Sequence, residues 1–496
     1  MRIITLFCLF VACLGPAGRA QTDAPRSRQL SLEDCVRLAL QFNLDVQIKR
    51  VSPLVDEFTL AGAYGAYDPA FGLNLKQGFN SSPGSSDPSS FLFNNPSENY
   101  TDTFGPSVTG TLPYGTRYTA SSSLVRNSGT SFKSGFSYSS VALLSLTQPL
   151  LKNFWMDAAR QTIEVSKRTL KMDELSLRFQ IMSTISSVEQ AYFDLIFARE
   201  NVKVQTNSLA LAEKLLAENK KRVEVGALAP LDEKQSESQV AARKSDLLSA
   251  LRDLAAQENA LKALLTGDFL TWRAVDIVPM DTLVAVPGAF NLQESWQRGM
   301  TLRPDLQQQR EAVERQNVVI RYSHNQLFPQ LDLTTTYGHN GLGGTVPSGL
   351  DGVWNGKNQF YSYGLVLTFP FSNTSAKNAY KASRASKEQL VLQLKQAEQN
   401  IIVAIDNAVK TAQNNFEKVD ATRQARIYAE AALDAEQKKL ENGKSTSFVV
   451  LSLQRDLTAA RSAEIRALAD YNKALSALAL SEGTTLDKAK LKVEVK

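Results

Sequence analysis

The residue types that usually carry catalysis or bind metals are sparse in this chain. The 496-residue sequence contains two histidines, His324 and His339, and one cysteine after residue 20, Cys35. They form no histidine pair and no cysteine cluster with the spacing of a metal site. The glycine-rich run at residues 341–344 lies between predicted strands, whereas a phosphate-binding loop joins a strand to a helix. We therefore expect no catalytic, cofactor-binding or metal-binding residues, and no enzyme activity.

The charged residues also point away from catalysis and from nucleic-acid binding. The chain has 55 basic and 50 acidic residues, which gives a formal net charge of +5. No basic cluster contains interleaved aromatic residues, the usual footprint of a nucleic-acid-binding surface. The acidic residues lie mostly in predicted helices, where charge runs usually mark solvated surface. We expect no nucleic-acid partner.

The first 20 residues have the pattern of an export signal. Arg2 precedes an apolar stretch at residues 3–14, and the small residues Gly18 and Ala20 precede a cleavage site. A lipoprotein box at residues 10–13, with Cys13 as the lipidated residue, is the alternative that this pattern leaves open. No later apolar stretch is long enough for a membrane-spanning helix. The exported chain then has no partner for Cys35, which we expect to be buried in a helix interface.

The elements behind this leader form an internal repeat. Residues 221–265 align without gaps with residues 438–482, and residues 30–73 align with residues 290–333. Such a repeat is the mark of a duplicated architecture. We expect a signal peptide at residues 1–20 and a first structural repeat at 21–289. A second repeat at 290–482 and a C-terminal tail at 483–496 would follow.

Each repeat contains a very long predicted helix. Residues 150–225 and 371–442 contain neither glycine nor proline and are rich in Ala, Leu, Glu, Lys and Gln, which are strong helix formers. Each could hold about 65 residues, or roughly 100 Å of helix. Apolar residues recur with heptad spacing, as in antiparallel coiled coils. Gly226 and Gly443 then supply turns at which each helix reverses into a second helix.

Strand-like segments separate the helices. Tyr361, Tyr363 and Leu365 alternate with Ser362 and Gly364, so one face is apolar and the other small or polar. This alternation is typical of transmembrane β-strands, although a soluble half-buried sheet gives the same pattern. We expect loops at residues 80–103 and 338–356, and an additional hairpin near residues 108–125. The other predicted strands are residues 331–338, 69–79 and 136–150.

The predicted strands of one chain are too few to close a barrel. Small closed barrels need about eight strands, and open strand edges in lipid leave backbone groups unsatisfied. Several copies must therefore share one barrel if the strands cross a membrane. Three copies that each supply four strands would form a twelve-strand barrel. The same three copies would supply twelve helical columns around a hollow duct.

Five sequence motifs resemble the TolC-type outer-membrane efflux protein family. They are LSLED at residues 30–34, VGALAPLD at 225–232, RPDL at 303–306, LFPQL at 327–331 and FPF at 369–371. The resemblance covers nearly all of the exported chain. It implies an α+β membrane protein: a homotrimeric twelve-strand transmembrane β-barrel in the outer membrane, continued by a long α-helical coiled-coil barrel in the periplasm.

The resemblance also implies a function and partners. Family members serve as passive exit ducts of tripartite efflux pumps or type I secretion systems. An inner-membrane transporter supplies the energy, and a periplasmic adaptor docks at the helical tips. The residues of this chain that match those tips are Gly226, Ala227, Leu228, Gly443, Lys444 and Ser445.

The periplasmic aperture departs from the family pattern. Asp232 matches an acidic position after the first tip, where a solvated carboxylate at a helix start is the plainer interpretation. Val449 and Ser452 stand at the two acidic positions after the second tip. We therefore expect closure to rest on apolar packing of Phe448 and Val449. The alternative function for the whole chain is a periplasmic coiled-coil scaffold or adaptor on a soluble β-domain.

Overall fold

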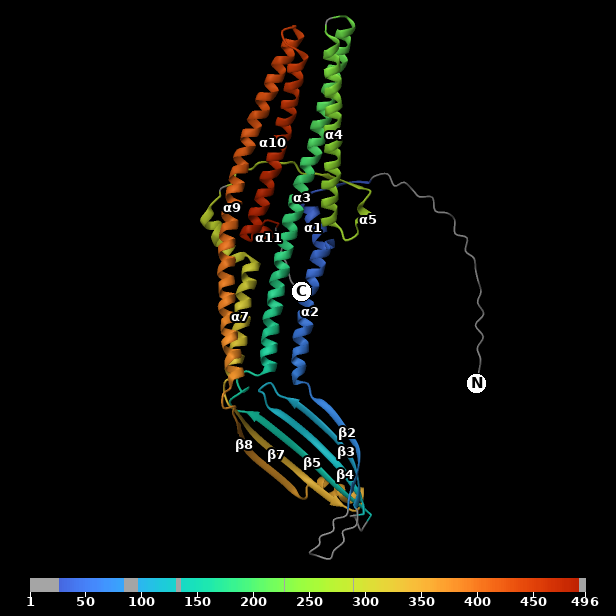
Figure 1. Cartoon of the computed structure of the whole chain (residues 1–496), viewed down its shortest axis with the longest axis vertical. Helices are drawn as coiled ribbons and strands as arrows, with labels where there is room; N and C mark the ends of the chain where they lie inside the picture. The colour runs from blue at the N-terminus through green and yellow to red at the C-terminus, as the bar shows by residue number, and fades with distance from the viewer. Residues whose placement is uncertain (1–25, 84–96, 131–134, 227, 289, 490–496) are drawn as a thin grey trace, which may run out of the picture. The chain divides into compact units, whose positions relative to one another are not determined.

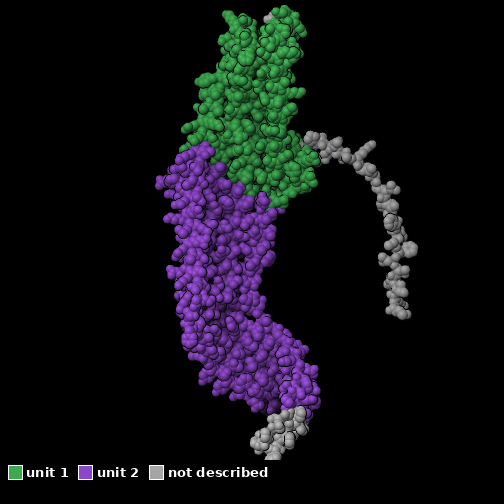
Figure 2. Space-filling model, in the orientation of Figure 1, with its two compact units in different colours: residues 1–44, 184–288, 413–476 green, residues 45–183, 289–412, 477–496 purple. Residues whose placement is uncertain are grey.

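A computed structural model describes residues 26–83, 97–130, 135–226, 228–288 and 290–489. The predicted signal peptide, including Cys13, lies outside these residues. The chain divides into two compact units, coloured separately in Figure 2. Unit 1 comprises residues 1–44, 184–288 and 413–476, and unit 2 comprises residues 45–183, 289–412 and 477–496.

Unit 2 contains an antiparallel sheet of six strands in the order β2-β3-β4-β5-β7-β8 (Figure 1). The expectation of four strands per chain is therefore wrong. The additional hairpin is real, and its two strands are as long as their neighbours. Their serine, threonine and glycine content makes the alternation weak in the sequence. The strands are β2 (Ala70–Ser82), β3 (Ser97–Thr111), β4 (Arg117–Gly129), β5 (Phe136–Pro149), β7 (Gln330–Gly343) and β8 (Gln359–Thr368).

Both predicted loops are shorter than expected. Strand β2 extends to Ser82 and β3 begins at Ser97, so strand residues occupy much of the expected loop at 80–103. In the expected loop at 338–356, β7 continues to Gly343 and helix α8 (Val346–Trp354) follows. Thr345 caps this helix: its hydroxyl accepts a hydrogen bond from the Ser348 amide. The glycines of this segment had favoured a loop, but they permit close packing of α8 on the sheet.

The helical part of unit 2 is one layer of long helices. Ion pairs join α2 to α3 (Lys49–Asp173, 3.6 Å) and α7 to α9 (Arg310–Glu398, 3.6 Å). Arg168 of α3 also pairs with a carboxylate of α7 at 2.7 Å. These contacts give the order α2-α3-α7-α9. The helices are α2 (Leu44–Tyr64), η1 (Gly65–Tyr67), α3 (Ala158–Glu224), α6 (Leu292–Leu302), α7 (Pro304–Asn325), α9 (Thr374–Glu441) and α11 (Thr485–Lys488), with α3 and α9 continuing into unit 1.

A hydrophobic cluster joins the helices of the second repeat within unit 2. Leu306 of α7 and Ile405 of α9 are fully buried, and Leu478 packs against them. Gly299 of α6 lies against this cluster, where an added Cβ would stand 2.4 Å from the Ile405 side chain. Burial of these side chains holds the short helix α6 against α9.

Unit 1 contains two helical hairpins and a small parallel strand pair. The predicted long helices are confirmed: α3 has 67 residues and α9 has 68. Gly226 (φ +74°) and Gly443 (φ +67°) take the left-handed conformation predicted for the two reversals. Pro230 occupies the first turn of the return helix after the first tip. The other elements are α1 (Leu32–Phe42), α4 (Pro230–Leu265), α5 (Phe269–Trp272), α10 (Ser447–Glu482), β1 (Arg26–Leu30) and β6 (Val275–Pro279).

Candidate functional site

The two faces of the sheet differ in chemistry along its whole width. The strand register aligns one residue from each strand into a row across the sheet. One row is almost entirely apolar, and the adjacent row, on the opposite face, is small and mostly hydroxylated. The apolar row is Phe71, Val108, Ala120, Leu144, Tyr337 and Tyr361. The adjacent row is Ala70, Thr109, Thr119, Ser145, Thr336 and Ser362.

Large apolar side chains on the first face are strongly exposed. Phe71 is 71% exposed, Tyr361 is 70% exposed and Tyr363 is 79% exposed. A soluble protein rarely exposes a contiguous apolar surface of this extent. Strands of ten or more residues, apolar on one face and polar on the other, have the length and pattern of transmembrane barrel strands.

The sheet and the helical layer are both open at their edges. Strands β2 and β8 each pair with a single neighbour. In the helical layer, α2 presents Val51, Val55 and Phe58 as exposed side chains, and the outer helix α9 likewise exposes Leu392 and Val403. Each chain therefore exposes apolar surface and unpaired backbone groups at matching edges.

The predicted tip residues lie at the two helix reversals. Leu228 is half-buried, Lys444 is exposed, and Ala227 lies outside the described residues. The hydroxyl of Ser445 donates a hydrogen bond to Glu436 of α9. This hydrogen bond, with that from Lys439, lowers the pKa of the Glu436 carboxyl.

The predicted aperture residues are only partly brought together. Phe448 and Ser452 of α10 line a cleft of about 200 Å³ with Gln235 of α4. Phe448 is 65% exposed and Val449 is 38% exposed, so neither side chain is packed within one chain. Asp232 lies in the first turn of α4 and does not line this cleft.

A buried polar group near the tips was missed by the sequence analysis. Asn219 of α3 is fully buried. Its amide nitrogen donates a hydrogen bond to the Ser236 hydroxyl of α4 (2.9 Å). Its amide oxygen accepts one from the Ser447 hydroxyl of α10 (3.1 Å). One side chain thus joins both hairpins, as a buried asparagine fixes register in coiled coils.

More polar contacts continue along the same α3–α10 interface. The Thr458 hydroxyl donates to the Ser208 hydroxyl (3.0 Å), and the Ser462 hydroxyl donates to Asn201 (2.8 Å). Farther along, the Lys473 ammonium contacts a carboxylate of α3 at 2.9 Å. We call these contacts, with Asn219–Ser447 and Ser186–Ser476, the polar seam.

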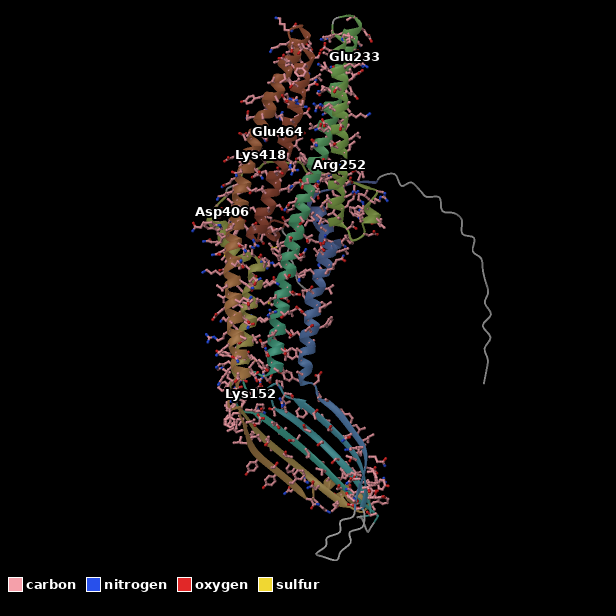
Figure 3. The ribbon with its side chains drawn as sticks, viewed as in Figure 1. Lys152, Glu233, Arg252, Asp406, Lys418 and Glu464 are labelled. Atoms are coloured by element: carbon pink, nitrogen blue, oxygen red, sulfur yellow. The ribbon has the colours of Figure 1, made fainter. Side chains whose placement is uncertain are left out.

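The contacts within the second hairpin are different. Leu433 and Leu440 of α9 pack against Val450 and Leu457 of α10 in a buried apolar cluster. Farther along, Glu464 of α10, labelled in Figure 3, forms ion pairs with arginines of α9. Leu215 of α3 belongs to the same cluster. Helix α10 is therefore held to α9 mainly by burial of leucine and valine, and to α3 by both apolar burial and the polar seam.

Cys35 of α1 is buried, as predicted. Burial raises the pKa of its thiol to about 12, with a smaller contribution from nearby carboxylates. Beside it, the Tyr192 hydroxyl donates to Asp281 (2.8 Å), and the same carboxylate accepts a hydrogen bond from the Leu32 amide (2.9 Å). Burial is also the main cause of the raised pKa of Tyr192. These contacts fasten the start of α1 to α3.

Neither a membrane-spanning helix nor a metal-binding group is present among the described residues. No helix in this part of the chain is long and apolar enough to cross a bilayer. Across the same residues, no three or more His, Cys, Asp or Glu side chains are grouped to hold a metal ion.

Proteins similar to this chain include outer-membrane channels. The family model "Outer membrane efflux protein" matches residues 93–267 and 298–484, which is most of the chain. The chain belongs to the outer membrane efflux protein family. A curated relative, the cobalt-zinc-cadmium resistance protein CzcC of Cupriavidus metallidurans, is 23% identical over 62% of this chain and 67% of its own length.

Solved channel structures share the fold at low identity. The Campylobacter jejuni CmeC outer membrane channel aligns with a TM-score of 0.66 and 16% identity, covering 92% of this chain and 86% of that chain. The Vibrio cholerae outer membrane protein VceC aligns with a TM-score of 0.65 and 16% identity, covering 91% and 96%. Family membership confirms the resemblance, the transport class and the predicted location in the outer membrane with a periplasmic helical extension. It fits a channel rather than an enzyme.

Proposed function

We propose that the protein is the passive outer-membrane exit duct of a tripartite efflux pump or type I secretion system, built from three copies. Two features of the chain together support this proposal. The sheet exposes an apolar face, and both the sheet and the helical layer have open edges. A single copy in lipid would leave the outer backbone groups of β2 and β8 unsatisfied, at several kcal/mol each. Neighbouring copies would remove that penalty by forming hydrogen bonds with these backbone groups.

The helical layer supports the same assembly. The exposed side chains of α2, among them Val51 and Phe58, would pack against the exposed Leu392 and Val403 of α9 in the next copy. Such contacts are heterologous, and they close into a ring when the rotation between copies is regular. Each copy would supply the two repeats, residues 21–289 and 290–482, after removal of residues 1–20. Residues 483–496 would form the tail.

The duct needs partners because its own sequence carries no nucleotide-binding loop. An inner-membrane transporter would supply energy, and a periplasmic adaptor would contact the tips of the hairpins. The proposed docking residues are Gly226, Ala227, Leu228, Gly443, Lys444 and Ser445.

The proposed aperture lies next to these tips. Phe448 is 65% exposed in one chain, and neighbouring copies would cover it if the ring closes there. Val449 and Ser452 would line the same narrow part, with Asp232 as its remaining acidic position. Closure would then depend on apolar contact more than on charge.

Reconstitution tests the channel. Purified protein in detergent is expected to have the mass of three copies and to produce stepwise conductance in planar bilayers. Trp at position 363 (Tyr363→Trp) is expected to be quenched by brominated lipid, since Tyr363 lies on the exposed apolar face. A protein that remains monomeric in water without detergent, with Trp at position 363 unquenched, would instead support the scaffold alternative.

A further inference from the structure

We infer that each copy places six strands in the barrel wall, so that the channel proposed above is closed by eighteen strands, with β2 of one copy paired to β8 of the next. This inference rests on the proposed trimer. A trimer built from four strands per copy would have to exclude the β3–β4 hairpin from the wall. The contacts of that hairpin favour its inclusion.

The β3–β4 turn lies at the helical end of the sheet. The Leu112 amide donates to the Thr116 carbonyl (2.8 Å), which closes the turn. Gly115 (φ +83°) lies against the start of α3: a Cβ there would stand 3.1 Å from the Arg160 guanidinium and 3.3 Å from the Asn153 carbonyl. Strand β3 therefore runs back to the periplasmic rim. Barrels have short turns at that rim, whereas an extracellular hairpin would have its turn at the other end.

The hairpin is paired to its neighbours over nearly its full length. Strand β2 pairs with β3 from Ala70↔Thr109 to Ser82↔Ser97 without interruption. Strand β4 pairs with β5 from Arg117↔Thr147 to Ser128↔Phe136. Removing the hairpin from the wall would break both ladders and leave their backbone groups to find other partners, at several kcal/mol for each group left unsatisfied in lipid.

The apolar face continues across the half of the hairpin nearer the helices, whereas the outer half of the same face carries the Asp102–Arg126 ion pair. Phe104 and Val108 of β3 and Leu124 of β4 stand on the same face as Leu75 of β2, in direct register. Phe104 is 50% exposed and Val108 is 37% exposed. A hairpin surrounded by water would gain nothing from an apolar stripe aligned with its neighbours, whereas a lipid-facing hairpin requires one.

The two free edges are complementary in direction. Strand β2 leads away from the helical end, since it follows α2 and η1, and β8 leads back towards it before α9. Placed side by side in neighbouring copies, they are antiparallel, as all neighbouring strands within one copy are. Strand directions alternate around the whole barrel only if each copy supplies an even number of strands.

The width of such a barrel matches the proposed helical ring. Eighteen strands spaced at about 4.8 Å and tilted by about 40° have a perimeter of roughly 110 Å. Twelve helical columns at about 9–10 Å also give roughly 110–120 Å. A twelve-strand barrel of the same tilt has only about 75 Å. The eighteen-strand barrel would be about 1.5 times wider, because diameter grows with strand number.

Cysteine labelling with lipid quenching tests the position of the hairpin. Cys35 is buried, so a single introduced cysteine can be labelled with a fluorophore in the assembled protein. We compare Val108→Cys with Thr109→Cys, its neighbour on the opposite face, and with Tyr363→Cys on β8. In vesicles of brominated phosphatidylcholine, the labels at positions 108 and 363 are expected to lose fluorescence to a similar extent. The label at position 109 is expected to keep most of its fluorescence.

The outcomes separate the two proposals. Quenching at position 363 without quenching at position 108 would exclude the hairpin from the wall and overturn the eighteen-strand barrel, while leaving the channel intact. No quenching at either position would refute the channel itself. Leu124→Cys with Ser123→Cys repeats the comparison on β4 if the first variant fails to assemble. Native mass spectrometry gives the copy number, and any number other than three contradicts eighteen strands.

Discussion

Replacing Asn219 with alanine should loosen the hairpin tips. Its side chain is fully buried and makes two hydrogen bonds, to Ser236 and Ser447. The substitution removes both, at about 0.5–1.5 kcal/mol each. It also deprives the buried Ser447 hydroxyl of its Asn219 acceptor, which adds about 1–3 kcal/mol. Ser236 loses less, because its hydroxyl still donates to the Asp232 carbonyl at 2.9 Å.

These contributions sum to about 2–6 kcal/mol against local separation of the hairpins. Hydrogen exchange measures this quantity directly, since amides at the tips exchange through local opening. A loss of about 3 kcal/mol corresponds to roughly 100-fold faster exchange. The effect should be confined to the tip half of α3, α4 and α10 in the full-length assembled protein.

Asn207→Ala is the matched control. Asn207 lies on the same helix and is exposed, so the same substitution there should change exchange by little, within about 0.5 kcal/mol. The double variant Asn219→Ala/Ser447→Ala should recover part of the loss, because no buried hydroxyl is then left without its partner. Equal exchange in Asn219→Ala and Asn207→Ala would refute the view that this side chain holds the hairpins together.

Three further predictions follow from individual residues. Cys35, whose pKa is raised to about 12 by burial, should resist iodoacetamide at pH 8 and react once the protein is unfolded. Burial opposes ionisation of Glu311, but hydrogen bonds from Lys171 and Arg168 outweigh it and lower its pKa below the usual 4.5. The stability from this carboxylate is therefore present above pH 4.5 and is lost as the pH falls through the lowered value. Thermal melts of Glu311→Gln should consequently depend less on pH below that point than those of the wild type. Gly443→Pro should spare membrane insertion and impair export, since φ is +67° there; unchanged export would argue against a docking role for the second tip.

The helical half of the fold could be predicted from the sequence for a simple physical reason. Long stretches without glycine or proline leave no interior position where a helix would break, so α3 and α9 extend to the glycines at their tips. Those glycines have positive φ, as a helix reversal requires. Local backbone preferences are therefore enough to predict both features.

The sheet was harder to predict because its strands are encoded by alternation alone. Strands such as β4 carry Ser121, Ser122 and Ser123 in succession, so the alternation is weak even where an additional hairpin near residues 108–125 was predicted. Their strand conformation depends on pairing with β3 and β5, a long-range property that one segment does not reveal. The same limit applies to α8: Gly349 and Gly352 read as loop residues until the packing against β7 is known.

The candidate site was predicted in part, and for a related reason. Tip positions follow from the helix ends, but Asn219 is a single polar residue within a long, highly polar helix. Its burial arises only when α4 and α10 pack on the same side of α3. The sequence periodicity of a helix does not distinguish polar residues that become buried between helices from polar residues that stay in solvent.

The difference between the two helix interfaces bears on how the tips can rearrange. Leu433, Leu440 and Val450 lose contact with apolar neighbours if α9 and α10 separate, and water offers nothing in return. The hydroxyl pairs of the polar seam, such as Thr458–Ser208, can exchange their partners for water at little net change in free energy. Separation along α3–α10 would also break the buried Asn219–Ser447 contact and expose Leu215, so polar contacts and apolar burial both resist it.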